Sequence, residues 1–470
     1  MLRDITYSVA DGNLGLANTA GTGNHIKIGA SAVEAPEPVI ITGTMSAERI
    51  KDRLGLSPLA DAVMDSVENG APKIFCIPVN QGMDGTVSEV KKTPENAAGA
   101  VAVEGKPANA FKIIVKITGK GGLNTAVFRY SLNGGKSWSE DITVPDGGKY
   151  EVDRAGIVFT FSTESEFNIN DSFTCTTTAP VMTSENILDA VDRIRNISAA
   201  CEFVHIVGPS LPELWAAVSI KQKELMDRYR RPVFFILEAY EKGEEEKTAD
   251  YISRLEADRG KISNYDIQVV AARGYYTGMD GVTRDVNLAG AVCGLYARAS
   301  VQESIGKTAS YSISGDKLSG LLPSGIQEED IEEMDLAGYL TFRQYDGLAG
   351  YYVTNARVMC PEDSDFRYAE DVRVKNKIIR LTRQAALKQL QADVDMENVD
   401  ADLAAKAEFI TADVEKQMVD KKEISSLSIS VPEGQDILRT ETMEMEIRYV
   451  PVGKIREIKI RLGMENPYAS

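Results

Sequence analysis

Short apolar runs alternate with helix-length amphipathic stretches along much of this chain, and this alternation limits the folds that the chain can adopt. Strand-like runs occupy residues 39–41, 73–79, 203–207, 233–237 and 267–272, and helix-like stretches occupy residues 46–68, 183–200 and 212–229. Strands this apolar need cover on both faces, because a sheet with one wet face shows polar residues at every second position. The pattern therefore predicts an α/β core with a mixed sheet and helices on both of its faces.

A stretch of different texture, residues 84–180, interrupts this alternation. It contains short strand-like segments separated by glycine-rich turns, with Asn133-Gly134 between two of them. Asn-Gly is a strong hairpin signal, because both residues accept positive φ. Short strands at this spacing are typical of an all-β sandwich or barrel. We therefore expect a β-rich insertion at 84–180 inside an α/β core domain formed by residues 21–83 and 181–338.

The pattern changes again after residue 338. Two helix-like stretches at 369–393 and 401–419 are followed by strand-like stretches at 424–430, 441–450 and 454–462. Helices followed by gathered strands predict an α+β unit. We place a C-terminal α+β domain at 339–452, an extended N-terminal arm at 1–20 and a C-terminal strand or arm at 453–470.

Composition excludes some classes of function. The chain has 70 acidic and 52 basic residues and a formal net charge of -18, which disfavours nucleic acid as a partner. The N-terminus does not resemble a secretory signal, and no apolar run is long enough to span a bilayer. Five scattered cysteines are typical of free thiols in a reducing compartment. We expect synthesis in the cytoplasm and no membrane insertion.

Residues that could support catalysis are scarce. Of the two histidines, we expect His25 in a glycine-rich loop and His205 in a core strand. Residues 21–26 do not follow a predicted strand, so their glycines do not form a dinucleotide-binding loop. The acidic runs at 244–246 and 328–333 are typical of solvated surface. We therefore predict no catalytic residue, no cofactor and no metal.

The C-terminal stretch is basic although the chain is acidic. Ile458 and Ile460 fall on one face of an extended segment, and Lys459 and Arg461 fall on the other. Two interpretations are open: a solvent-facing edge strand protected by its charges, or an arm that adds to a neighbouring subunit's sheet. The second extended arm at the N-terminus favours strand exchange.

The insertion also carries a resemblance to a known family. Its FRYSLNGGKSWSEDITVPDGGKYEVDRAGIVFTF and DSFTCTTTAP segments resemble a recurrent stretch of contractile-tail sheath proteins from bacteriophages and phage-tail-like bacteriocins. The N-terminal DGNLG resembles the start of such proteins. The order of parts is similar too: arm, α/β core, β insertion, remaining core, α+β domain and arm.

The resemblance implies a structural subunit without enzymatic activity. Such subunits polymerise as stacked hexameric rings around a tail tube protein, meet baseplate and tail terminator proteins, and contract to drive the tube through a cell envelope. The implied site of synthesis is the cytoplasm of a bacterial host, followed by assembly in a virion or tail-like particle. Carried over by position, the strand-exchanging residues are Ile5, Tyr7, Val9, Ile455, Ile458, Lys459, Ile460 and Arg461.

A basic helical segment could face the tube. Its cationic residues are Arg373, Lys375, Lys377, Arg380 and Arg383, and a solvated helix face is the alternative interpretation. Two other functions stay open for the whole chain. One is a non-contractile baseplate or surface structural protein, and the other is an α/β enzyme with a β-sandwich insertion.

Overall fold

The computed structural model describes residues 21–80, 82–162, 166–361 and 363–465. Contacts divide the chain into two compact units, with the division after Arg380.

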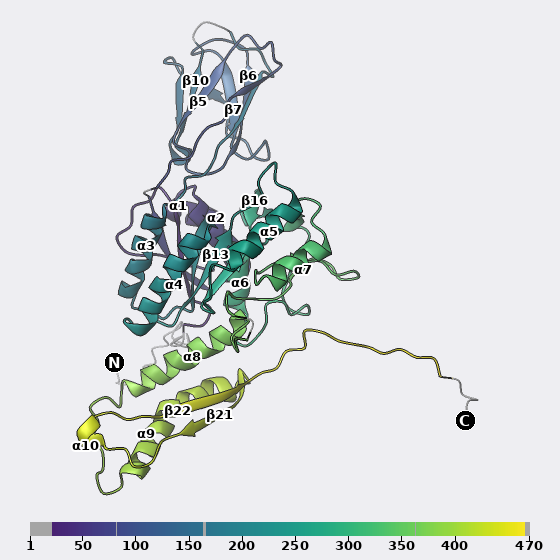
Figure 1. Ribbon diagram of the computed structural model, residues 1–470. Helices are drawn as coiled ribbons and strands as arrows, with labels where there is room; N and C mark the ends of the chain where they lie inside the picture. Colours follow the sequence, from purple (N-terminus) through teal and green to yellow (C-terminus); the bar gives the residue numbers. More distant parts are fainter. Residues whose placement is uncertain (1–20, 81, 163–165, 362, 466–470) are drawn as a thin grey trace, which may run out of the picture. The chain divides into compact units, whose positions relative to one another are not determined.

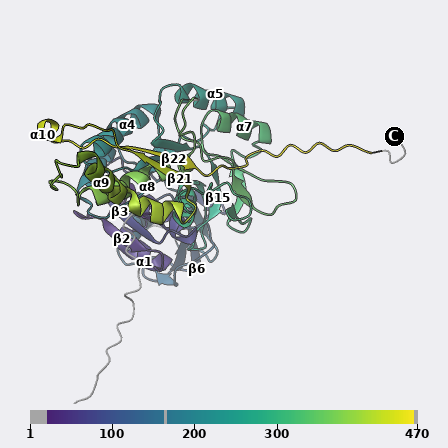
Figure 2. The same ribbon diagram turned by 90° about the horizontal axis from the view of Figure 1, so that it is seen from below.

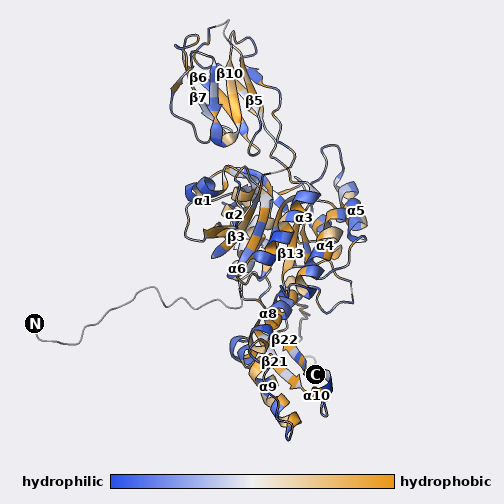
Figure 3. Cartoon of the chain, turned by 90° about the vertical axis from the view of Figure 1, so that its left-hand side faces the viewer, coloured by the Kyte–Doolittle hydropathy of each residue, from blue (hydrophilic) through white to orange (hydrophobic). Residues whose placement is uncertain are grey.

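A six-stranded sheet is the centre of the first unit (Figure 1), in the order β14-β13-β12-β1-β3-β2. Its strands are β1 (His25–Ala30), β2 (Val39–Thr42), β3 (Lys73–Val79), β12 (Phe203–Ser210), β13 (Phe234–Ala239) and β14 (Ile267–Val270). Strand β2 runs antiparallel to β3, and the other neighbouring pairs are parallel. The prediction of a mixed α/β fold is therefore confirmed. Strand β13 is hydrophobic along most of its length (Figure 3) and fully buried.

Helices pack on both faces of this sheet. Helices α3 (Ser184–Asp192), α4 (Pro212–Asp227) and α5 (Thr248–Arg259) share one core cluster with β1 and β12. Helices α1 (Ala47–Leu54), α2 (Pro58–Glu68) and α6 (Ala289–Arg298) pack in the clusters of the opposite face. Helix α7 (Glu328–Leu336) lies against α5.

The single helix expected at 46–68 is wrong, because the chain forms α1 and α2 instead. Gly55 ends α1 with a positive φ of 70°, a conformation that favours glycine. Ser57 then caps α2 by accepting a hydrogen bond from the Ala60 amide, and Pro58 occupies the first turn, where no amide donor is needed.

The central strand β1 was not predicted, and the expectation of a loop at His25 is wrong. His25 and Lys27 alternate with Ile26 and Ile28, so the segment reads as half polar. All six residues of β1 are nevertheless buried between β12 and β3. Such an alternation usually indicates one solvent-exposed face. Here both faces of the strand are buried, one with polar and the other with apolar side chains.

The insertion forms two sheets around their own hydrophobic core. The three-stranded sheet has the order β5-β10-β9, and the five-stranded sheet has the order β4-β11-β6-β7-β8. The strands are β4 (Lys91–Thr93), β5 (Val101–Gly105), β6 (Lys112–Gly119), β7 (Val127–Ser131), β8 (Ile142–Thr143), β9 (Lys149–Val152), β10 (Ile157–Phe161) and β11 (Ser172–Thr176).

The hairpin signal at Asn133-Gly134 predicts a strand that follows directly and passes through Trp138. Among the described residues this strand is absent, and residues 132–141 form a loop instead. Two side chains near the loop's start hold it. Ser131 Oγ accepts a hydrogen bond from the Gly135 amide, and Asn133 Oδ1 accepts one from the Ser137 amide. These bonds to side chains replace the tight hairpin that Asn133-Gly134 indicated.

Residues 339–380 pack within the first unit. Two small sheets extend this unit. One is formed by β15 (Arg273–Thr277), β16 (Thr283–Asn287) and β18 (Leu318–Leu322), and the other by β17 (Ser312–Ile313), β19 (Phe342–Arg343) and β20 (Tyr351–Val353). Phe342 and Val353 share a core cluster with Phe203 of β12. The division by contacts thus falls later than residue 339, because these short strands complete the first unit's core. The five-part domain division stays a prediction.

The second unit is small. Helix α8 (Ala369–Ala386) spans the division between the units, and α9 (Val399–Val414) follows and ends in a π-helical turn. Strands β21 (Ile424–Ser430) and β22 (Glu446–Pro451) form an antiparallel sheet, with the short α10 (Ile437–Thr440) between them.

Candidate assembly site

The β21–β22 sheet has two strands in the described part of the chain, so each strand has an outer edge without a ladder partner there. Leu427 lies opposite Tyr449 and Ile429 opposite Ile447, and these four side chains are half-buried. A two-stranded sheet is marginally stable by itself, and an open edge is a template for a further strand. The sheet can therefore receive an extended segment.

The residues after β22 have the properties of such a segment. Residues 452–465 form no helix or strand, and the chain leaves the second unit as an extended trace (Figures 1 and 2). The exposed fractions of Ile455, Ile458, Ile460 and Leu462 are 83%, 75%, 83% and 97%. The strand expected at 454–462 is therefore wrong for a single chain. An extended segment becomes a strand only when a second backbone supplies its hydrogen bonds.

The other predicted arm residues are placed as follows. Lys459 and Arg461 are exposed, and Lys459 Nζ lies 3.3 Å from a carboxylate oxygen of Glu457. Ile5, Tyr7 and Val9 lie outside the described residues. The role of these residues in strand exchange stays a prediction.

Arg373 is fully buried in the first unit, which does not fit a surface that binds a tube. Its guanidinium forms an ion pair with the buried Glu202 and donates hydrogen bonds to the carbonyls of Tyr296 (2.8 Å) and Ala299 (3.0 Å). Although burial acts to raise the pKa of Glu202, the charge of Arg373 holds that pKa below its usual value. Glu202 also accepts a bond from the Gly23 amide at 2.9 Å. The pair therefore connects α8 to the starts of β1 and β12.

The remaining basic residues of α8 differ in exposure. Lys375 Nζ lies 3.0 Å from a carboxylate oxygen of Asp266, Lys377 is buried, and Arg380 donates a bond to a backbone carbonyl. Arg383 is exposed. Of the five predicted tube-facing residues, Arg383 alone is exposed, and its contact with a tube stays a prediction. The sequence did not reveal that four of these five cations are buried or half-buried.

A buried polar chain crosses three adjacent strands of the sheet. Lys27 Nζ donates to His205 Nδ1 at 2.6 Å, which leaves the proton of the neutral imidazole on Nε2. His205 Nε2 then donates to Glu238 Oε1 at 3.0 Å. Burial and the charge of Lys27 keep the pKa of His205 well below its usual value, and burial raises the pKa of Glu238 to about 7. The expectation of His205 as a core residue is confirmed.

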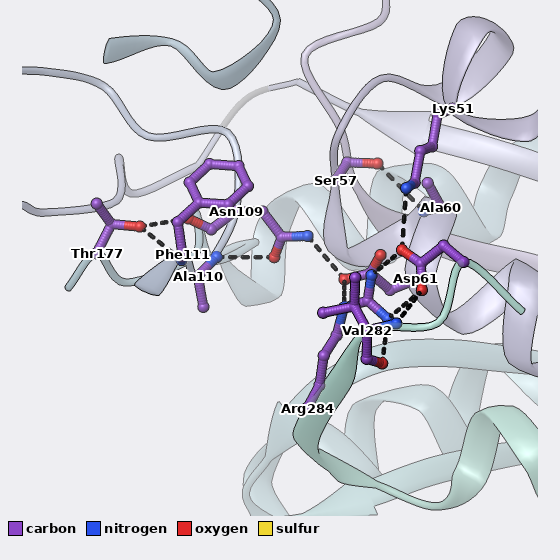
Figure 4. Close-up of polar contacts among 11 residues, drawn as sticks. Lys51, Ser57, Ala60, Asp61, Asn109, Ala110, Phe111, Thr177, Val282 and Arg284 are labelled. Atoms are coloured by element: carbon purple, nitrogen blue, oxygen red, sulfur yellow. Dashed lines mark hydrogen bonds and ion pairs between the residues drawn. The ribbon is translucent and has the colours of Figure 1, made fainter. Parts of the chain in front are cut away.

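A second polar cluster lies where the insertion meets the core (Figure 4). Asp61 of α2 accepts a hydrogen bond from Asn109 of the insertion at 2.8 Å and pairs with Arg284 of β16 at 3.1 Å. Arg284 also pairs with Asp280, whose carboxylate lies 2.9 Å from Lys51 Nζ. Burial acts to raise the pKa of Asp280, but Arg284 and Lys51 lower it to about 2. The cluster fixes the insertion on α2 through Asn109.

Asp65, one turn further along α2, gives this region a testable pH dependence. Burial raises the pKa of Asp65 to about 8, so the folded chain holds a proton that the unfolded chain releases near pH 4. The unfolded state then binds fewer protons, and the free energy of unfolding falls as the pH rises from about 4 to about 8.

We expect Asp65→Asn to remove this dependence. Relative to the parent, the variant gains stability between pH 5 and pH 8, by up to about 4 kcal/mol at about 1.4 kcal/mol per unit of pKa. Urea unfolding at several pH values measures the difference. Asp250→Asn, an exposed change on α5, should follow the parent curve. A constant difference between Asp65→Asn and the parent across this range would contradict the assignment.

Within the described ranges, no group of three or more His, Cys, Asp or Glu residues could hold a metal ion. None of the helices described here is long and apolar enough to cross a membrane.

Comparison with known proteins links the chain to one family. A model described as the N-terminal domain of DUF2586 matches residues 2–357, and a model described as the C-terminal domain of DUF2586 matches residues 365–469. A search of curated proteins finds no match to this sequence.

Solved structures show a similar fold. The sheath complex of the extracellular contractile injection system PVC, in its contracted state, has a TM-score of 0.55 and 11% identity, and the match covers 99% of this chain and 98% of the other. A chain of the anti-feeding prophage baseplate, also contracted, has a TM-score of 0.53, 12% identity and 98% coverage of both chains. The sheath tail protein from Desulfitobacterium hafniense has a TM-score of 0.48 and 13% identity, and the match covers 96% of this chain and 100% of the other.

Proposed function

The chain belongs to the DUF2586 family, and we propose that it is the sheath subunit of a contractile tail or a tail-like injection particle. Its fold extends over nearly the whole length of a chain from a contractile-system sheath. Fold alone does not assign a function. The observation that carries the proposal is therefore local: within the described residues, one chain has both a two-stranded sheet with open outer edges and an extended terminal segment that forms no helix or strand.

These two features complement each other between copies. Residues 454–462 present backbone donors and acceptors, and Ile458, Ile460 and Leu462 form an apolar stripe with the period of a strand. Added to the outer edge of β21 or β22 in a neighbour, the segment gains a hydrogen-bonded partner and cover for this stripe. The N-terminal arm, through Ile5, Tyr7 and Val9, would add in the same way to a different neighbour.

Each chain then both lends and receives strands, which is a heterologous contact. Such contacts close into rings or continue as helices. We infer stacked hexameric rings around a tail tube, in which the C-terminal domain (339–452) and the arms (1–20 and 453–470) form the connected inner layer. The α/β core (21–83 and 181–338) and the insertion (84–180) move as rigid bodies when the sheath contracts.

No catalytic step is part of the proposal. The buried histidines are fixed in the sheet core: His25 stacks on Phe203, with ring centroids 4.6 Å apart, and His205 lies between Lys27 and Glu238. Groups enclosed in this way contact no substrate. We propose that contraction uses free energy stored when copies assemble in an extended lattice and needs no cofactor.

The proposed partners and site of assembly follow from this role. The chain binds copies of itself, a tail tube protein, and baseplate and tail terminator proteins. Synthesis takes place in the cytoplasm of a bacterial host, and assembly takes place in a virion or tail-like particle.

Negative-stain electron microscopy of the purified chain, over a range of concentrations and with or without a tail tube protein, tests the proposal. Hollow tubes with regular striations are the expected result. Closed rings that never extend would favour a baseplate component instead. A chain that stays monomeric under all of these conditions would contradict the sheath assignment.

A further inference from the structure

One face of the insertion is basic although the chain is acidic. In the five-stranded sheet, Ile113, Val115 and Ile117 of β6 point into the hydrophobic core. Alternate residues therefore point outward, and directly paired residues on neighbouring strands share a face. Lys116 lies opposite both Ser172 and Arg129, and Thr174 lies opposite Lys91. With Lys112, these residues form what we call the basic sheet face: Lys91, Lys112, Lys116, Arg129, Ser172 and Thr174.

Within the described residues, the cations of this face form no ion pair, although one carboxylate lies near them: Asp141, just before β8, accepts a hydrogen bond from Thr118 of β6 at 3.0 Å. None of the outward positions in these five strands holds Asp or Glu. In the described part of the chain, Lys106 and Lys120 of the insertion pair with Asp84 and Glu166, but the four cations of the face have no salt bridge, and neither have Lys92 and Lys149. The chain as a whole carries 70 acidic and 52 basic residues, so a cluster of this sign is not expected from composition.

Protection of a sheet edge does not explain these cations. Lysines often occupy edge strands, where they prevent pairing with other chains. Lys112 and Lys116, however, lie on β6, which is the middle strand in the order β4-β11-β6-β7-β8. Their charges therefore stand over the centre of the sheet.

An aromatic ring fixes one cation of the face. The guanidinium of Arg129 lies 4.6 Å from the centroid of the Trp138 ring. The buried Nε atom of Arg129 has no hydrogen-bond partner among the described residues. The ring thus orients the guanidinium of Arg129.

We propose that the basic sheet face binds an anionic polysaccharide. Lys112 and Lys116 are four residues apart on one strand, a distance of about 13 Å, and Arg129 is about 5 Å across from Lys116. Charges at these separations match anionic groups spaced along an extended chain. The hydroxyls of Ser172 and Thr174 lie between the cations and both donate and accept hydrogen bonds, as the hydroxyls of sugars require.

Nucleic acid fits this face less well. Single strands bind on exposed aromatic platforms, and the ring of Trp138 is already covered by Arg129. A single copy of this chain can bind a polysaccharide without assembling into a sheath. The inference therefore does not depend on the sheath assignment.

Titration of the full-length chain with alginate, a polymer of uronic acids, tests the inference. We expect binding at low salt that weakens as the salt concentration rises. Lys112→Glu with Lys116→Glu should weaken it roughly tenfold or more, because charge-assisted contacts are replaced by repulsion. The matched control is Lys421→Glu with Lys422→Glu, two exposed residues whose replacement changes the net charge equally. The control should bind as the parent does.

Three further probes distinguish the alternatives. Neutral dextran should not bind, and duplex DNA and poly-glutamate should bind much more weakly than alginate. If DNA binds as strongly as alginate, the face attracts polyanions non-specifically and the inference is wrong. If poly-glutamate binds more strongly than alginate, the ligand of the face is an acidic protein instead. Two results would overturn the inference. One is that the chain does not bind alginate at low salt. The other is that a Lys112→Ser, Lys116→Ser variant, which melts as the parent does, binds alginate as strongly as the parent.

Discussion

A chain that ends at Val452 is expected to fold as the full-length chain does but to form no tubes. The apolar side chains of the removed segment are almost fully exposed, so their loss removes little packing within the chain. The neighbour's sheet edge, in contrast, would lose its added strand and the cover of Ile458, Ile460 and Leu462. Burial of each such side chain contributes about 1.5–3 kcal/mol. Thermal unfolding and electron microscopy measure the two properties separately.

Substitutions on the two faces of the segment sharpen this prediction. Ile458→Ser with Ile460→Ser should prevent tubes as the truncation does, because the apolar stripe is lost while the backbone is kept. Lys459→Ser with Arg461→Ser, on the opposite face, should leave tubes and change only their dependence on salt. Normal striated tubes from the truncated chain would refute the role of the arm.

Arg373→Met is expected to destabilise the first unit by about 3–5 kcal/mol, because it leaves Glu202 charged, buried and unpaired. It also removes the donor for the carbonyls of Tyr296 and Ala299. Urea unfolding followed by tryptophan fluorescence measures the loss. A Trp138→Phe background isolates the signal of Trp215, which is buried in the first unit's core.

Two variants test the cause of this loss. Arg383→Met removes an exposed charge from the same helix and should change stability by less than about 0.5 kcal/mol. Arg373→Met combined with Glu202→Gln removes both charges and should recover part of the loss, as expected for coupled residues. If Arg373→Met unfolds at the same urea concentration as Arg383→Met, the buried pair does not hold α8 in place.

The fold could be predicted from the sequence where a buried strand consists mostly of apolar residues. Strand β3 was predicted with its observed bounds, because a run of apolar residues lies between a turn and a polar segment. Strand β1 was missed, because His25 and Lys27 imitate a wet face. They are buried since their partners, Phe203 and His205, come from β12, which is far away in the sequence. Periodicity reports polarity, and it cannot report which distant group satisfies a polar side chain.

The candidate site was only partly accessible to sequence reasoning, for the same reason. The alternation of Ile458 and Ile460 with charged residues predicted a strand and left two interpretations open, an edge strand or an arm for a neighbouring subunit. In the structure, this segment forms no strand with the described residues of its own chain. The run of cations in α8 suggested a surface, whereas two of them form ion pairs: the buried Arg373 with Glu202, and the half-buried Lys375 with Asp266. Glu202 is a lone acidic residue before an apolar strand, and this feature was the one sequence signal of that pair.

Hydrogen exchange of residues 454–462 in the monomer and in assembled tubes tests strand exchange most directly. In the monomer these residues belong to no helix or strand, so their amides should exchange at nearly unprotected rates. In tubes, about every second amide should become strongly protected, because one side of an added strand pairs with the sheet edge. Tubes in which these amides exchange as fast as in the monomer would contradict the account.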